Sequence, residues 1–208
     1  MKKYHIIYCD PPWSYRDKKK SGRTKCGAEN HYPTLTLEEL KQLPIQNICE
    51  DNCVLYMWVT FPMLKEGLEL IEAWGFEYKT LGFDWTKLNS DGSIWHGVGA
   101  YSKSNNEICL FATKGNVGRL MRDENGKEIV FDPKEKLSVR SNNVSCNVQA
   151  VRGKHSEKPE EVRRRIEELW GNVSRVELFA RKKVEGWDSI GFDIDGRDIR
   201  EVLEGYNG

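Results

Sequence analysis

The chain has 208 residues, with 32 basic and 32 acidic side chains and a formal net charge of zero. This length suits one domain with a full core, which we expect to span residues 1–208. The balanced charge excludes a global field that attracts nucleic acid, so any such contact must come from local basic patches. No apolar stretch is long enough to cross a membrane, and six cysteines without a CxxC pair indicate reduced thiols in a cytoplasmic protein.

The first predicted strand covers Tyr4–Cys9 and leads into Asp10, Pro11, Pro12 and Trp13. β-Branched and aromatic residues favour a buried strand, and the two prolines then prevent both helix and strand pairing. The strand must therefore end at Asp10, in a rigid turn that displays a carboxylate, backbone carbonyls and an indole. Ligands of open α/β sheets bind at such carboxyl ends of strands.

A polar-Pro-Pro-aromatic sequence at a strand end resembles the catalytic motif of amino-group methyltransferases that use S-adenosylmethionine. The exocyclic nitrogen of adenine is a poor nucleophile because its lone pair is delocalised into the ring. Acceptance of its two N–H bonds by Asp10 and the Pro11 carbonyl would return that lone pair to the nitrogen, and Trp13 offers a face for an extruded base. The alternative interpretation is a structural Pro-Pro turn with a core tryptophan.

A basic loop over Ser14–Asn30 follows this turn, and it is predicted either to contact phosphates or to be a solvated surface loop. His31 and Tyr32 come next. The basic residues of the loop that we expect to bind substrate are Lys18, Lys19, Lys20 and Arg23.

Further elements alternate in type along the chain. Thr36 and Glu39 form a capping box that predicts a helix toward Ile48. Strand, helix and strand with short links predict an α/β sheet. The expected ranges are a strand over 53–60, a helix over 62–74 ended by Gly75, and strands over 76–86 and 107–113.

The second half of the chain contains the least legible segment, residues 119–147, in which a hairpin between 120–121 and 129–131 is expected. A strand over 146–152 and a helix over 160–170 follow, with Arg163, Arg164 and Arg165 on its solvated sides. A strand over 173–181 and a weak helix near 199–203 complete the chain. We expect the loops 14–30, 92–106 and 119–147 to carry substrate specificity.

Several separated segments together resemble the DPPW family of N6-adenine methyltransferases, which includes the catalytic subunit of the eukaryotic messenger-RNA adenosine methyltransferase. The likeness is greater to small single-domain bacterial and phage members. The segments are Asp10–Trp13, His31-Tyr32-x-Thr34, Leu55-x-x-Trp58-Val59-Thr60, Trp74-Gly75-Phe76, Trp85-x-Lys87, Gly97-x-Gly99-x-Tyr101, Glu107–Gly115, His155-Ser156-x-Lys158-Pro159 and Glu177-Leu178-Phe179-Ala180-Arg181. The resemblance implies an α/β fold with a Rossmann-like methyltransferase sheet, in a permuted order that places the catalytic strand before the cofactor strand.

The resemblance also implies roles for individual residues. Tyr32, with His31 and Lys87, is expected to contact substrate, and Lys158 to contact the methionine moiety of the cofactor. The remaining expected cofactor-binding residues are Asp10, Glu177, Leu178, Arg181, Lys183 and Asp193. Phe192 stands where the family often has an amide, and its side chain cannot supply that contact.

We therefore expect S-adenosylmethionine-dependent methylation of the N6 amino group of adenine in DNA, by direct in-line transfer without a metal. The alternatives are methylation of RNA by the same chemistry, a catalytically silent partner subunit, and a plain nucleic-acid-binding protein. A homodimer or a complex with a related subunit is also consistent with the family.

Overall fold

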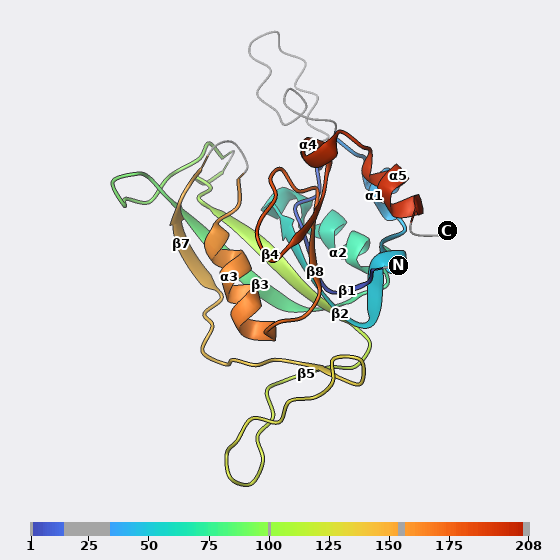
Figure 1. The fold of residues 1–208 in the computed structure, drawn as a ribbon. Helices are drawn as coiled ribbons and strands as arrows, with labels where there is room; N and C mark the ends of the chain where they lie inside the picture. The colour runs from blue at the N-terminus through green and yellow to red at the C-terminus, as the bar shows by residue number, and fades with distance from the viewer. Residues whose placement is uncertain (1, 15–33, 100, 154–156, 206–208) are drawn as a thin grey trace.

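A computed structural model describes residues 2–14, 34–99, 101–153 and 157–205. Its centre is a seven-stranded sheet in the order β7-β3-β4-β2-β1-β8-β9 (Figure 1). The strands are β1 (Tyr4–Cys9), β2 (Cys49–Val59), β3 (Glu77–Leu88), β4 (Asn106–Lys114), β7 (Asn147–Val151), β8 (Arg175–Leu178) and β9 (Asp188–Ile190).

Strand β4 runs antiparallel to both of its neighbours, β2 and β3, whereas the other pairings in this sheet are parallel. The carboxyl ends of β1, β3 and β8 therefore meet at one edge, and the first residues of β4 reach that same edge. Asp10, which follows β1, and Glu107, the second residue of β4, are brought to one side of the sheet in this way.

Helices cover both faces of the sheet (Figure 1). One face packs against α1 (Leu37–Lys41), α2 (Leu64–Ala73) and α5 (Ile199–Glu204) through an apolar cluster that includes Leu40, Ile71 and Leu203. The other face packs against α3 (Glu160–Trp170). Alternation along β1 supplies both layers, since Ile7 belongs to the first cluster and Tyr8 to the second.

This arrangement confirms the predicted α/β class and is consistent with the fold of S-adenosylmethionine-dependent methyltransferases. The strand before the Asp-Pro-Pro-Trp turn and the strand near the chain end, β1 and β8, are direct neighbours in parallel register, with Tyr8 opposite Glu177. Within the described residues, no helix combines the length and the apolar character needed to cross a bilayer.

The first helix is shorter than expected. The capping box is present, with the Glu39 N–H donating to the Thr36 hydroxyl, but α1 ends at Lys41. A separate 3-10 turn, η2 (Ile45–Ile48), follows Pro44. Proline lacks an N–H and disfavours helix in the residue before it, so the prediction of one helix to Ile48 is wrong.

Most other predicted elements are confirmed with shifted ends. The 3-10 turn η3 (Phe61–Met63) leads into α2, and Gly75 ends that segment with a φ of +76°. A side chain at Gly75 would also place its Cβ 2.1 Å from the amide nitrogen of Gln46. Helix α3 begins at Glu160 and ends at Trp170, as expected.

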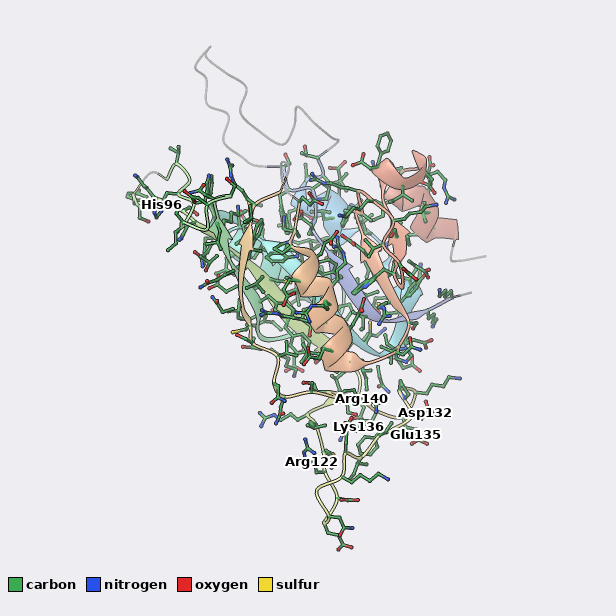
Figure 2. All side chains as sticks on the ribbon, turned by 60° about the vertical axis from the view of Figure 1, so that its left-hand side comes forward. His96, Arg122, Asp132, Glu135, Lys136 and Arg140 are labelled. Atoms are coloured by element: carbon green, nitrogen blue, oxygen red, sulfur yellow. The ribbon has the colours of Figure 1, made fainter. Side chains whose placement is uncertain are left out.

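Residues 119–136 form an arm, which we define as the segment between the short strands β5 (Val117–Gly118) and β6 (Leu137–Ser138). The predicted hairpin is present in it, because Arg122 and Glu128 pair and the Ile129 N–H donates to the Met121 carbonyl at 2.9 Å. Figure 2 shows the labelled arm residues at one end of the molecule and His96 at the other. The arm leaves the edge of the sheet opposite to Asp10, which argues against a contact of this part of the 119–147 segment with a base bound beside Asp10.

Candidate active site

Asp10 and Lys158 form an ion pair across 148 positions of sequence, with the Lys158 Nζ 2.6 Å from the Asp10 Oδ2. Asp10 follows β1 directly, and Lys158 stands two residues before α3. The lysine is buried, while the Asp10 side chain keeps 25% of its surface accessible. The Asp10 carboxylate is therefore accessible to solvent on one side and is held by a buried ammonium group on the other.

Glu107 extends this pair into a chain of alternating charges, and sequence reasoning did not single it out. One of its carboxylate oxygens lies 3.3 Å from the Lys158 Nζ, and the other lies 2.5 Å from the Nζ of Lys87 on β3. A charged residue directly before the apolar run 108–112 is the sequence signal that points to it. The antiparallel direction of β4, which carries it to this edge, could not be read from the chain.

The charges shift one another. Burial raises the pKa of Asp10, and Lys158 opposes that rise. Burial alone would lower the pKa of Lys158, but the carboxylates of Asp10 and Glu107 together raise it above the ordinary lysine value. Burial would likewise raise the pKa of Glu107, yet Lys158 and Lys87 lower it. Lys158 is consequently held protonated between two carboxylates.

The Pro-Pro turn is more enclosed than expected. The Pro11 carbonyl accepts the Trp13 N–H at 2.9 Å, and the Pro12 carbonyl accepts the Leu35 N–H at 2.9 Å. A carbonyl oxygen has two lone pairs, so Pro11 retains one acceptor position.

Trp13 does not offer an open face. Its side chain is 5% exposed, lies in the apolar cluster under α1 and α2, and places its Nε1 3.4 Å from the Trp58 carbonyl. The expectation of a stacking platform is wrong for this structure, and the alternative of a core tryptophan fits. Burial of a large aromatic side chain stabilises the fold more than a partly exposed position at the cavity edge would.

A cavity opens beside Asp10 at the point where the chain order of the sheet reverses. From β1 the chain continues to β2 on one side, and from β8 it continues to β9 on the other, which is the usual ligand position in such sheets. The lining residues come from the turn after β1, the segment before α1, the ends of β8 and β9, and α4 (Phe192–Asp195) with α5. They are Asp10, Pro12, Leu35, Phe179, Ala180, Arg181, Gly191, Phe192, Asp193, Asp198, Ile199 and Arg200.

The backbone beneath this cavity is unusual at two positions. Phe179 adopts a φ of +58°, a left-handed conformation that is uncommon for an aromatic residue and that often marks functional sites. Gly191 approaches the next loop so closely that a Cβ there would lie 2.3 Å from the Ala180 carbonyl oxygen. Together they bring the ends of β8 and β9 into contact, with the Ala180 N–H donating to the Ile190 carbonyl at 3.0 Å.

The predicted cofactor-binding residues divide into two groups. Asp10, Arg181 and Asp193 line the cavity, as does Phe192 in place of an amide. Leu178 is buried in the core, and the exposed Lys183 is not among the described lining residues.

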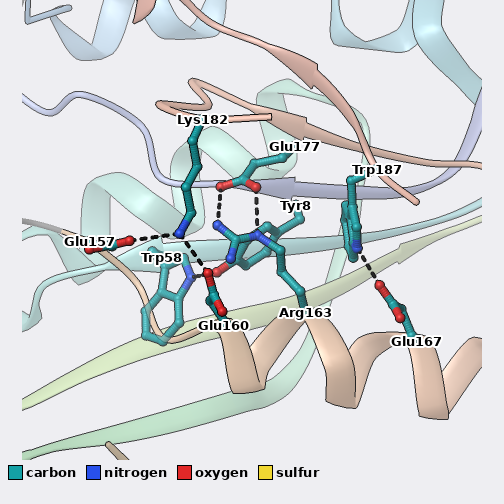
Figure 3. Close-up of polar contacts among 9 residues, drawn as sticks. All are labelled: Tyr8, Trp58, Glu157, Glu160, Arg163, Glu167, Glu177, Lys182 and Trp187. Atoms are coloured by element: carbon teal, nitrogen blue, oxygen red, sulfur yellow. Dashed lines mark hydrogen bonds and ion pairs between the residues drawn. The ribbon is translucent and has the colours of Figure 1, made fainter. Parts of the chain in front are cut away.

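Glu177 points away from the cavity, toward α3. Its carboxylate takes both the Nε and an Nη of Arg163, at 2.7 and 3.1 Å (Figure 3). This geometry argues against the predicted cofactor contact of Glu177. Arg163 itself is 5% exposed, so the expectation that it lies on a solvated side of its helix is wrong.

The predicted substrate-binding residues fall mostly outside the described residues, namely Lys18, Lys19, Lys20, Arg23, His31 and Tyr32. Lys87 is described, and its ammonium group forms an ion pair with the Glu107 carboxylate. Its Nζ also lies 5.2 Å from the ring centre of Trp85 and 5.3 Å from that of Trp95. Lys87 thus belongs to the series of ion pairs that runs through Glu107 and Lys158 to Asp10.

Comparison with known proteins agrees with this geometry. The MT-A70 family model matches residues 4–193. The Type II methyltransferase M.MunI of a Mycoplasma species is 34% identical over 98% of this chain and 83% of its own length. The human N(6)-adenosine-methyltransferase catalytic subunit METTL3 is 27% identical, and the human N(6)-adenine-specific methyltransferase METTL4 is 26% identical.

Each of these two human proteins matches over 93% of this chain, which spans 29% of METTL3 and 38% of METTL4. The M.MunI match covers nearly all of this chain and most of M.MunI, so the correspondence is not confined to a short motif. The resemblance inferred from the separated motifs is confirmed, and the chain belongs to the MT-A70 family of methyltransferases.

Proposed function

We propose that the protein transfers a methyl group from S-adenosylmethionine to the exocyclic N6 amino group of adenine in DNA. The observation that carries this proposal is the Asp10 carboxylate, held by buried Lys158 at the mouth of a cavity between the ends of β1 and β8. DNA is favoured over RNA because M.MunI, a Type II methyltransferase, matches along most of its length, whereas the chain spans under a third of METTL3.

The side chains around the cavity fit the proposed cofactor. Arg181 offers a cation for its carboxylate, and Asp193 offers an acceptor for ribose hydroxyls. Leu35, Phe179 and Ile199 supply apolar surface for a base. When bound, S-adenosylmethionine supplies an electrophilic methyl group on a sulfonium centre.

The residues of the turn prepare the amino group. The Asp10 carboxylate accepts one N–H of the adenine amino group, and the free lone pair of the Pro11 carbonyl accepts the other. These bonds favour a pyramidal nitrogen with its lone pair available for attack. Because Lys158 and the prolines already hold both acceptors, little reorganisation is needed during the reaction. After methylation the nitrogen must lose one proton, and Asp10 is the carboxylate placed to receive it.

We further propose that residues 1–208 form one methyltransferase domain, because a single sheet joins Tyr4 to Ile190. A cytoplasmic location, and a homodimer or a related partner subunit, stay predictions.

The direct test is transfer of radiolabelled methyl groups to duplex DNA, single-stranded DNA and RNA of mixed sequence, followed by identification of the labelled base. Label in N6-methyladenine that disappears in Asp10→Asn, with DNA preferred, supports the proposal. Asp51→Asn is the matched control, because Asp51 lies on β2 near the opposite edge. Label in RNA alone would establish the RNA alternative. Cofactor binding without transfer to any polymer would favour a silent subunit.

A further inference from the structure

The chain Lys87–Glu107–Lys158–Asp10 joins four separate segments of the fold through three ion pairs, at 2.5, 3.3 and 2.6 Å. Lys87 comes from the end of β3, Glu107 from the start of β4, Lys158 from the segment before α3, and Asp10 from the turn after β1. The proposed chemistry uses only the last member. We propose, on the basis of the proposed function, that Glu107 and Lys87 are positioning residues of the methyl transfer, acting on Asp10 through Lys158.

The burial of these groups separates them from ordinary surface ion pairs. The side chains of Lys87, Glu107 and Lys158 are 16%, 17% and 7% exposed. Exposed pairs contribute little and tolerate rearrangement, whereas buried charges must keep their partners. Loss of any member would remove an ion-pair partner from each of its neighbours, so the geometry of each member depends on the others.

Glu107 acts on Asp10 in two ways that have the same sign. It competes with Asp10 for the single ammonium group of Lys158, and its negative charge disfavours a second negative charge nearby. Both effects leave the Asp10 carboxylate more basic and less saturated by Lys158. A carboxylate in that state accepts an N–H from the substrate better than one fully neutralised by its cation.

Among the residues that the structure describes, the charged groups that act on Asp10 come from three segments. They are Lys158 before α3, Glu107 on β4 and Arg181 after β8. The two cations stabilise the ionised form of Asp10, and Glu107 is the one anion among them.

Lys87 fixes the far end of the chain. Its ammonium group lies near the rings of both Trp85 and Trp95, and the Trp95 ring also lies 5.0 Å from the Arg152 guanidinium. The backbone N–H of Trp95 donates to the backbone carbonyl of Lys87 at 2.9 Å. Lys87 thus ties the loop between β3 and β4 to the carboxylate of Glu107.

The decisive measurement is a carbon-13 NMR titration of the Asp10 and Glu107 side-chain carboxyls in the whole protein, with signals assigned through Asp10→Asn and Glu107→Gln. This reads the positioning effect without cofactor or substrate. In Glu107→Gln the midpoint of Asp10 moves to lower pH by about 1 unit, whereas in Lys158→Met it moves to higher pH. In Lys87→Met the midpoint of Glu107 rises, and Lys87→Arg restores it.

Glu69→Gln is the matched control, because Glu69 pairs with Lys41 on the outer helices and leaves both midpoints unchanged. An Asp10 midpoint that is the same in Glu107→Gln and in the wild type would overturn the proposal. If Glu107→Gln does not fold, an unchanged Glu107 midpoint in Lys87→Met overturns it instead.

The pH dependence of single-turnover methyl transfer provides the second reading. Its acidic limb moves to lower pH in Glu107→Gln and to higher pH in Lys158→Met, whereas a purely structural role would lower the rate without moving the limb. Failure of the wild type to methylate any nucleic acid would contradict the proposed function. That failure is separate, because the NMR midpoints report the coupling whether or not transfer occurs.

Discussion

Arg163 of α3 binds both carboxylate oxygens of Glu177 on β8, and the two side chains are only 7% and 13% exposed. This pair fastens the helix that follows Lys158 to the strand that precedes Arg181. A second contact on the same side joins Lys182 to Glu157 and Glu160, at 2.9 and 2.7 Å (Figure 3). The two segments on either side of the site are therefore held by ion pairs on the side of the sheet that carries α3.

Removal of one partner of the Arg163–Glu177 pair is predicted to destabilise the protein strongly. Arg163→Met leaves the Glu177 carboxylate buried without its cation, at a cost of about 3–5 kcal/mol in the free energy of unfolding. The double variant Arg163→Met with Glu177→Leu recovers most of that loss, because no charge is left buried. Urea denaturation measures both values, and a single variant as stable as the wild type would show that the pair is dispensable.

Lys158→Met is predicted to slow methyl transfer about 100-fold while binding of S-adenosylmethionine changes little. The reason is that Lys158 contacts Asp10 and Glu107 and is not among the described residues that line the cavity. Single-turnover rates and calorimetric dissociation constants separate the two effects. A large loss of cofactor affinity with an unchanged rate would instead place Lys158 in the cofactor site, as the family resemblance implies.

Lys158 also predicts a pH dependence of stability. The pKa of Lys158 is raised in the folded protein above its ordinary value of 10.5, so the stability that it contributes is complete below that value. This contribution is lost as pH rises through the folded-state pKa. The free energy of unfolding of the wild type will therefore fall more steeply above pH 10.5 than that of Lys158→Met. Parallel curves for the two proteins would contradict the shift.

Gly191→Ala is predicted to weaken cofactor binding at least tenfold. The added Cβ would lie within 2.3 Å of the Ala180 carbonyl and must push apart the loops after β8 and β9, both of which line the cavity. Gly205→Ala is the matched control, because no heavy atom of the described residues beyond its chain neighbours lies within 4 Å of the added Cβ. Calorimetric titration with S-adenosylmethionine distinguishes the two variants, and equal affinities would show that the contact of the loops does not shape the site.

Shortening the arm is predicted to leave catalysis unchanged. Replacement of residues 122–128 by a two-glycine turn alters only the outer part of the arm, which lies at one end of the molecule (Figure 2). We expect the same methylated sequence and a kcat within about twofold of the wild type, since surface changes away from the buried core and the candidate active site have small effects. A changed target sequence would return the arm to the group of specificity loops.

The sequence predicts the positions of helices and strands better than it predicts the partners of buried charged side chains. The strand before Asp10 and the helix from Glu160 to Trp170 follow from periodicity and terminal signals, which are properties of short segments. The positions of Glu107 and Arg163 do not, because each depends on a partner distant in sequence. Arg163 sits in a run of arginines that is typical of a solvated face, and only the register of β8 shows that Glu177 meets it.

The prediction of an exposed Trp13 is wrong for a related reason. The turn that carries it looks exposed when taken alone, yet the segment before α1 pairs with it through Leu35, and Trp13 and Leu35 belong to the same buried apolar cluster. Whether a residue at a strand end is open or covered depends on what returns to that edge, and no local pattern records this.

The reversal of β4 divides the connecting segments of this enzyme into two kinds. A segment that enters β4 arrives beside the reacting groups, and its length and composition are under chemical constraint. A segment that leaves β4 departs from the far side, where the chain can lengthen without disturbing them. We therefore expect that a domain, tag or binding module inserted within residues 122–128 leaves the fold and the candidate active site unchanged.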